Sequence, residues 1–197
     1  FRNAGGQFFQ EVTTSGGFGH LQKGHGISFG DLDNDGDQDI YAQMGGAFTG
    51  DHFYNALFEN PGHGNHWITL KLEGVKSNRA ALGVRIKVIV ENPNGERAIY
   101  KTVSTGGSFG ASPLRQEIGL GEAKSIKAVE VFWPVTGKTQ ILKNLTLDQF
   151  YRVREGDTGA VPWKLKTFKL ASGPASTAIW SSPGRPNRPR PKGSHSG

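Results

Sequence analysis

Residues 31–39 constrain this chain more than any other stretch, because they place five carboxylates within one short loop. They follow the pattern D-x-D-x-D-G-x-x-D, which begins at Asp31 and ends at Asp39. Five anions this close repel one another, and several resist ionisation unless a cation lies among them. The glycine at the sixth position, Gly36, permits the sharp turn that gathers oxygens from positions 1, 3, 5 and 9. Hard oxygen ligands at these offsets suit Ca²⁺.

The flanks of this loop distinguish it from an EF-hand. An EF-hand loop needs a glutamate at position 12 and a helix on each side. Position 12 here is Ala42, and the flanking stretches 27–29 and 40–42 predict strands. The sequence therefore predicts a calcium loop between two β-strands. The alternative is a solvated acidic turn, which does not need this periodicity.

Composition favours an all-β protein. Glycine contributes 29 of 197 residues, and long helical patterns are missing. The length leaves room for one or two domains. The absence of cysteine excludes disulfides and thiolate metal sites but leaves the cellular compartment open. No apolar run approaches the roughly 18 residues that a membrane-spanning helix requires.

The net charge of +6 is unevenly distributed. Residues 160–197 hold seven lysines and arginines and no acidic residue, so the remaining residues sum to −1. The basic charge therefore belongs to a C-terminal arm and not to the folded body. This distribution argues against a nucleic-acid-binding domain, which carries its positive charge on a folded face or a defined arm.

Residues 1–64 are predicted to form an N-terminal unit. The segment 1–6 reappears in degraded form at 58–63, and the spacing of 57 residues suggests an internal repeat. Between the two copies lie a strand-like stretch at 7–13, a glycine-rich link and the acidic loop. The unit corresponds to one propeller-blade-sized segment plus the edge of the next.

Residues 65–159 are predicted to form an antiparallel β-sandwich of about seven short strands. Apolar and polar residues alternate with period two in several stretches, which is typical of half-buried strands. These stretches are 66–72, 84–88 and 126–133. The turn at 92–95 predicts a hairpin between strands 83–91 and 96–104, and 149–154 predicts a closing strand.

Residues 160–197 are predicted to form an extended arm. The stretch 163–170 alternates well enough for one more strand. The stretch 183–192 is rich in proline and arginine, cannot build a core and favours polyproline II. Where such an arm is ordered, we expect a neighbouring subunit to hold it.

Two parts of the chain resemble known families. Residues 29–40, FGDLDNDGDQDI, resemble the FG-GAP (VCBS-type) repeat of calcium-binding β-propellers. Residues 65 to about 155 resemble the ASPIC/UnbV domain that follows such repeats in cartilage-acidic-protein-like secreted proteins. The pieces that carry this second resemblance are, in order, 65–68, 77–83, 106–109, 119–121 and 133–134.

The resemblance implies secretion, calcium-stabilised β-structure, a binding or adhesive role and no established catalysis. It assigns ligand roles within the loop as follows: side-chain ligands Asp31, Asp33, Asp35 and Asp39, and a backbone-carbonyl ligand at Asp37. A propeller closes with four to eight blades, and this chain has little more than one. Either it is the C-terminal piece of a longer protein, or another chain completes its open sheet edge. The start at Phe1 predicts a mature or trimmed product.

Two further groups of residues, one of histidines and one of aromatic residues, could form binding sites, but a structural interpretation is preferred for both. His52, His63 and His66 could bind zinc, but nothing places them on one rigid element, and surface histidines are the preferred interpretation. A second trio, Trp67, Trp133 and Phe109, could stack against sugars, although their apolar strand patterns favour core packing. Asn144 begins a glycosylation sequon, and 172–183 is rich in serine, threonine and proline. No nucleophile elbow is present.

The sequence therefore predicts a secreted, extracellular, all-β module that binds Ca²⁺ and is not an enzyme. Its expected role is structural, in adhesion or self-assembly (including filaments), through exposed sheet edges and the C-terminal arm. The expected partners are identical subunits or another extracellular protein, and neither nucleic acid nor a membrane span is expected. The alternative is a glycan- or matrix-binding module of a larger secreted protein.

Overall fold

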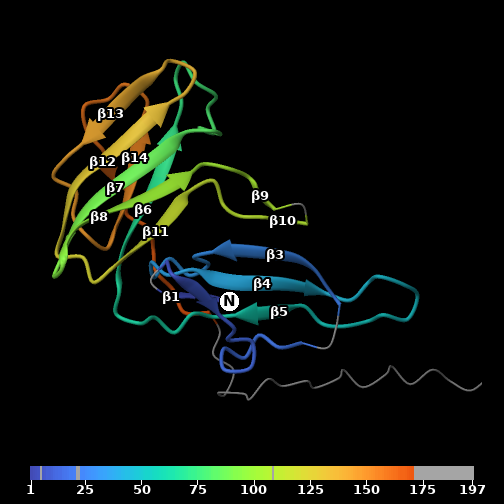
Figure 1. Ribbon diagram of the computed structural model, residues 1–197. Helices are drawn as coiled ribbons and strands as arrows, with labels where there is room; N and C mark the ends of the chain where they lie inside the picture. Colours follow the sequence, from blue (N-terminus) through green and yellow to red (C-terminus); the bar gives the residue numbers. More distant parts are fainter. Residues whose placement is uncertain (5, 21–22, 108, 171–197) are drawn as a thin grey trace, which may run out of the picture.

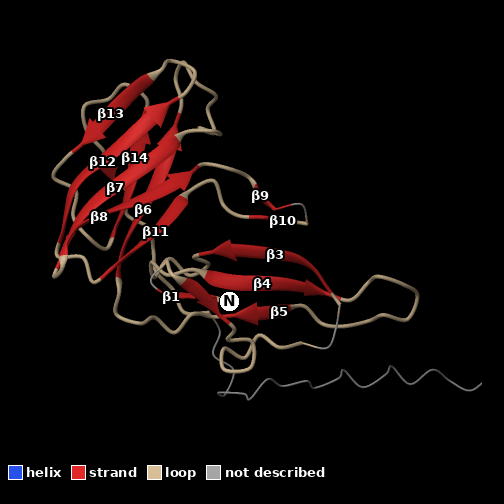
Figure 2. Ribbon diagram, in the orientation of Figure 1, coloured by secondary structure: helices blue, strands red, loops and turns tan. Residues whose placement is uncertain are grey.

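The computed structural model describes residues 1–4, 6–20, 23–107 and 109–170. Strands and connecting loops make up this described part, and no helix occurs in it (Figure 2). The strands form several open sheets, and the all-β prediction is confirmed. Two bodies are visible in Figure 1, a sandwich at the top and a smaller N-terminal sheet below it.

The sandwich consists of two four-stranded sheets with the strand orders β11-β6-β14-β15 and β13-β12-β7-β8. The strands of the first sheet are β6 (His66–Glu73), β11 (Gln116–Gly121), β14 (Gln149–Arg154) and β15 (Val161–Pro162). The strands of the second sheet are β7 (Arg85–Asn92), β8 (Gly95–Thr102), β12 (Ser125–Trp133) and β13 (Lys138–Leu142).

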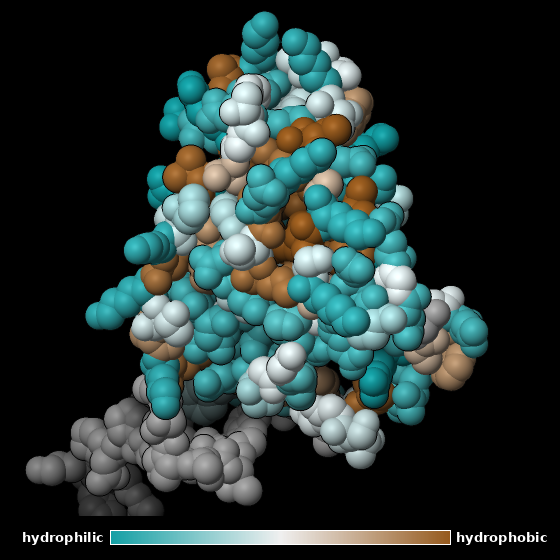
Figure 3. Space-filling model, turned by 90° about the vertical axis from the view of Figure 1, so that its left-hand side faces the viewer, coloured by the Kyte–Doolittle hydropathy of each residue, from teal (hydrophilic) through white to brown (hydrophobic). Residues whose placement is uncertain are grey.

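The core lies between these two sheets. Alternate residues of β7 and β12 are buried, because successive side chains of a strand face opposite sides. Ile68 and Leu70 of β6 and Val88 and Val129 of the other sheet are fully buried, and Trp133 belongs to the same cluster. On the face that Figure 3 shows, hydrophilic residues predominate, and hydrophobic patches lie between them.

The sandwich is not wholly antiparallel, and this part of the fold prediction is wrong. Strand β14 runs parallel to β6, from the pair Gln149↔Ile68 to the pair Arg154↔Glu73. Parallel neighbours need a long crossover, and here the whole second sheet lies between the two strands in the chain. Period-two alternation is the same in both orientations, so the sequence could not distinguish them.

The predicted hairpin at residues 92–95 is confirmed, since Asn92 pairs with Gly95 at its end. The strand predicted for 163–170 is wrong. Only Val161–Pro162 pairs with β14, and it does so within the segment predicted as an arm. The N–H of Trp163 still donates a hydrogen bond to Phe150 O of β14, and the chain then leaves the sheet, so that Phe168 reaches the acidic loop. The predicted features at 172–183 and 183–192 lie outside the described residues.

The N-terminal unit contains a three-stranded sheet and a separate hairpin. The sheet strands are β3 (Gly24–Gly30), β4 (Asp39–Met44) and β5 (Ala56–Phe58), and the hairpin strands are β1 (Arg2–Ala4) and β2 (Phe8–Gln10). The strand expected over 7–13 is therefore shorter than predicted. Asn3 Oδ1 and Asn60 Oδ1, at equivalent positions of the suggested repeat, each accept a hydrogen bond from a glycine N–H, but the donor lies three residues later in the first copy and two residues later in the second.

A short hairpin from the sandwich reaches the N-terminal sheet. Its strands, β9 (Gly106–Gly107) and β10 (Gly110–Ala111), lie beside β3 (Figure 1). A Cβ at Gly110 would overlap the backbone of Ile27, and one at Gly26 would overlap the backbone of Phe109. Glycine at both positions lets the two backbones approach closely. This contact places the acidic loop against the sandwich.

Candidate metal centre

The acidic loop joins β3 to β4, as the sequence predicts. The two strands are antiparallel, and Gly30 pairs with Asp39 at the base of the loop. Two residues inside it have positive φ, Asn34 at 60° and Gly36 at 101°. Glycine adopts this conformation without steric cost, and asparagine tolerates it better than most residues. The loop is therefore a tight turn.

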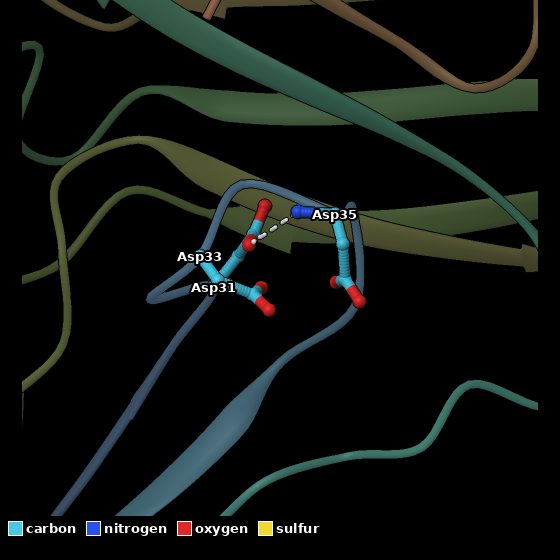
Figure 4. A group of neighbouring side chains, drawn as sticks. All are labelled: Asp31, Asp33 and Asp35. Carbon is cyan, nitrogen blue, oxygen red and sulfur yellow. Dashed lines mark hydrogen bonds between the residues drawn. The ribbon is translucent and has the colours of Figure 1, made fainter. Parts of the chain in front are cut away.

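Three carboxylates converge inside this turn. One oxygen from each of Asp31, Asp33 and Asp35 lies within 4.8 Å of the others, and Figure 4 shows the three side chains around a common space. Asp31 and Asp33 are buried, whereas Asp35 is exposed. Ca²⁺ holds its oxygen ligands at about 2.3–2.6 Å, so two oxygens on one ion lie at most about 5 Å apart. The three residues fit a single calcium ion.

Backbone amides of the turn orient two of these carboxylates. Asp31 Oδ1 accepts a hydrogen bond from the N–H of Asp35 at 3.1 Å, and Asp31 Oδ2 accepts one from the N–H of Gly36 at 3.2 Å. Asp35 Oδ1 accepts a hydrogen bond from the N–H of Asp37 at 3.1 Å. The side chains are therefore fixed by the same backbone that forms the turn.

Asp39 and Asp37 lie outside the group of three. Asp39 Oδ2 accepts a hydrogen bond from Leu32 N–H at 3.0 Å, and its Oδ1 accepts one from Asn60 N–H at 2.9 Å, so it ties the loop to the turn after β5. Asp37 Oδ1 is buried and has no hydrogen-bond partner among the described residues. The structure thus brings together three of the five predicted ligands by their side chains.

Burial and mutual repulsion make full ionisation of the loop unfavourable. Burial raises the pKa of Asp31 to about 6, although the positive charge of Arg115 opposes this change. Burial, together with the charges of Asp35 and Asp39, raises the pKa of Asp37 to about 6. The pKa of Asp33 is also raised, by burial and by the charge of Asp35. A cation in the turn would relieve this repulsion.

Arg115 and Glu117, at the start of β11, clamp the loop from the sandwich side. Arg115 Nη1 donates a hydrogen bond to Asn34 Oδ1 at 2.8 Å, and Arg115 Nη2 donates one to the carbonyl oxygen of Asp31. Arg115 Nε also lies 2.8 Å from Glu117 Oε1. Glu117 accepts hydrogen bonds from the N–H of Asp31 at 3.2 Å and from Gln38 Nε2 at 2.7 Å.

No pattern in the sequence singles out these two residues as part of the site. Arg115 and Glu117 are two positions apart, which places them on one face of a strand. This spacing was visible in the sequence, but no local pattern indicates that the face opposes a loop about 80 residues earlier.

The first part of the C-terminal arm contacts the same loop. Thr167 Oγ1 donates a hydrogen bond to the carbonyl oxygen of Asn34 at 2.9 Å, and Asn34 Nδ2 donates one to the carbonyl oxygen of Lys166 at 3.1 Å. The N–H of Phe168 donates a hydrogen bond to the carbonyl oxygen of Asp33 at 3.0 Å. The sandwich and the arm therefore both hold Asn34, the residue at the tip of the turn.

The aromatic and histidine candidates do not form common sites. Trp133 is buried in the core, as its strand pattern predicts, whereas Phe109 is 74% exposed on the β9–β10 hairpin, contrary to a core position. Trp67 packs on Phe150, with ring centroids 4.7 Å apart, and against Gly36 of the loop. His66 Nδ1 lies 2.7 Å from Asp148 Oδ2, and no histidine joins a ligand group within the described part of the chain.

The family model described as ASPIC and UnbV matches residues 74–160. The match starts after β6, extends over the rest of the sandwich through β14, and includes Arg115 and Glu117 but not the acidic loop. The predicted ASPIC/UnbV domain is confirmed. The comparison with curated proteins gives no match for this chain. Among the described residues, no helix has the length and apolar character needed to span a membrane.

Proposed function

We propose that this chain is a secreted, extracellular calcium-binding module with a structural, non-catalytic role. The loop from Asp31 to Asp39 would hold Ca²⁺ and fix the N-terminal sheet against the ASPIC/UnbV domain. Exposed sheet edges and the C-terminal arm would then mediate adhesion or self-assembly. On this proposal the N-terminal unit is an FG-GAP/VCBS-type repeat, a partial propeller blade. The observation that carries the proposal is the convergence of oxygens from Asp31, Asp33 and Asp35 within 4.8 Å.

The donor set of the loop suits calcium. Ca²⁺ takes six to eight oxygen ligands in a flexible geometry and accepts carboxylates, carbonyls and water. Asp31, Asp33 and Asp35 supply carboxylate oxygens, and the carboxylate of Asp39 and the backbone carbonyl of Asp37 are the further candidates. Neither sulfur nor imidazole belongs to this set, so a hard cation is favoured over a soft transition metal.

Metal binding in this loop would act on three parts of the molecule at once. The loop belongs to the N-terminal sheet, Arg115 and Glu117 belong to the sandwich, and Thr167 belongs to the arm. A ligand that binds only the folded loop stabilises the folded state by mass action. Calcium would therefore stabilise the junction between the three parts as well as the turn itself.

The N-terminal sheet offers a surface for association. Ile27 and Phe29 of β3 are 55% and 44% exposed, and they line a hollow of about 530 Å³ together with Phe18 and Phe58. The short strand β5 forms one edge of this sheet. Exposed apolar faces and open edges are typical of surfaces that pair with another chain. An identical subunit or another extracellular protein is the proposed partner.

Size-exclusion chromatography with light scattering, in Ca²⁺ and again in EGTA, tests this function. We expect an assembly in Ca²⁺ that dissociates in EGTA and is lost in the Asp33→Asn/Asp35→Asn variant. The matched control is Glu59→Gln/Glu122→Gln, which removes two exposed carboxylates outside the loop and should assemble normally. A monomer under both conditions would contradict self-assembly.

A further inference from the structure

A groove lies on the outer face of the β11-β6-β14-β15 sheet. It has a volume of about 730 Å³, and residues of β6, β14 and β15 contribute to its walls, together with Leu114 and Trp163. Its size falls within the roughly 300–1,000 Å³ of small-ligand sites. The groove is built on paired strands, so its floor is rigid.

Four cationic side chains line this groove, namely Lys71, Arg79, Arg152 and Arg154. Glu73 and Asp157 are the acidic residues of the lining, which leaves a net charge of two positive. Lys71 lies directly opposite Arg152 in the strand register. Arg154 is two residues further along the same face of β14. Like charges directly opposite one another destabilise a sheet, so an anion bound between them would offset this repulsion.

Most of these cations have no ionic partner in the protein. Arg79 Nη2 lies 3.5 Å from Glu73 Oε1, and both side chains of that pair are largely exposed. Among the described residues, Lys71, Arg152 and Arg154 form no ion pair. The charges of Lys71 and Arg152 are therefore available to a ligand, whereas Arg154 lies opposite Glu73 in the strand register.

The ring of Trp163 packs against the guanidinium group of Arg152. The guanidinium carbon of Arg152 lies 4.8 Å from the centre of the Trp163 ring, the geometry of a cation–π contact. The backbone N–H of Trp163 donates a hydrogen bond to Phe150 O at 2.8 Å, which anchors the residue beside β14. The planar guanidinium is thus held in place and keeps donors for a planar or tetrahedral anion.

We propose that this groove binds an acidic carbohydrate, through the sulfate or carboxylate groups of its sugars. Arginine forks match both anions, and lysine adds a mobile point charge. Nucleic acid is less suitable, because single-stranded chains are bound along extended basic grooves with several stacking aromatics. Here the unpaired cations gather in one short groove with one tryptophan. No residue of the acidic loop lines this groove, although the arm that carries Trp163 also contacts that loop through Lys166 and Thr167.

Titration calorimetry of the full chain with a heparin-derived hexasaccharide, at near-physiological salt, tests this proposal. The Arg152→Gln/Arg154→Gln variant should bind at least about tenfold more weakly, since charge-assisted hydrogen bonds contribute that much or more. Lys71→Gln is a milder second variant that should weaken binding in the same direction. The matched control, Lys101→Gln/Lys124→Gln, removes two exposed charges outside the groove and should bind nearly as the unmodified chain.

Three further probes identify the ligand chemistry. A neutral hexasaccharide should not bind, and inorganic sulfate should bind weakly and compete with the acidic hexasaccharide. If sulfate alone bound as tightly as the hexasaccharide, the assignment to carbohydrate would be wrong. Oligothymidylate of equal charge that bound as tightly would also overturn it. Equal losses in the groove and control variants would show that diffuse charge, and not the groove, binds the polymer.

Discussion

The backbone N–H of Asp31 donates a hydrogen bond to Glu117 Oε1 at 3.2 Å, although 86 residues separate them in the chain. Both residues are buried, and Arg115 lies beside them with its Nε 2.8 Å from the same Glu117 oxygen. The first residue of the acidic loop is therefore fixed by the sandwich. The candidate metal centre and the ASPIC/UnbV domain consequently share one network of buried polar contacts.

Arg115→Gln should lower the free energy of unfolding by about 3–5 kcal/mol, as expected when one partner of a buried ion pair is removed. The variant leaves the buried carboxylates of Glu117 and Asp31 without their cation. Lys87→Gln is the control, because the Lys87–Glu130 pair is partly exposed and should contribute no more than about 1 kcal/mol. Urea unfolding of both variants measures the difference, and equal losses would contradict the clamp.

Gly36→Ala should destabilise the protein more than Gly50→Ala. Both glycines have positive φ, 101° and 93°, so an alanine is strained at either position by about 1–3 kcal/mol. At Gly36 the added Cβ would also overlap the indole of Trp67, whereas at Gly50 it would meet no atom within 4 Å. Thermal unfolding of the two variants compares these costs. Equal shifts would mean that the loop does not pack on Trp67.

Glu155 should make the sandwich sensitive to acid. Partial burial raises the pKa of this carboxyl, but hydrogen bonds from Ser77, Val75 and Lys76 outweigh that effect and lower the pKa to about 2. The contribution of Glu155 to stability is therefore present above about pH 4.5 and is lost as the pH falls toward 2.

Glu155→Gln tests this expectation through urea unfolding between pH 2 and pH 7. The variant should be less stable than the unmodified chain at pH 7, and the difference should shrink steadily below pH 4.5. A difference that stays constant over the whole range would show that the charge of Glu155 does not support the turn at 75–77.

The acidic loop should respond to pH in the opposite sense. The pKa of Asp31 and that of Asp37 are raised to about 6, from an ordinary value of 3.8, so the folded protein binds protons that the unfolded chain does not. Without metal, these two groups should add stability as the pH falls from about 7 to about 4.

Protons and calcium compete for the carboxylates of the loop, so the increase in melting temperature caused by Ca²⁺ should be larger at pH 7.5 than at pH 5. An increase that is equal at both values would contradict a role for these carboxylates in metal binding.

Local patterns in the sequence were sufficient to predict most of the strands. The alternation in 66–72 and 126–133 corresponds closely to β6 and β12, because one face of each strand is buried in the core. The pattern at 163–170 predicts a strand that the structure lacks, because period two also arises in an extended segment whose residues after Trp163 pair with no strand. Its polar backbone groups are satisfied partly by the acidic loop, through residues such as Phe168.

The candidate metal centre was predictable only in part. The spacing of Asp31, Asp33 and Asp35 within a tight turn is a local property, and the three side chains converge as expected. The contacts of Arg115 and Glu117 depend on the packing of one body on another. Such long-range contacts leave no periodic trace in a single sequence, and neither does the parallel pairing of β14 with β6.

Titration calorimetry of Ca²⁺ into the metal-free chain tests the central claim most directly. We predict one binding site per chain in the unmodified protein and no measurable binding in Asp33→Asn/Asp35→Asn, with the Glu59→Gln/Glu122→Gln control binding normally. No heat of binding in the unmodified chain, or equal binding in the loop variant, would show that the loop is an acidic turn and not a calcium site.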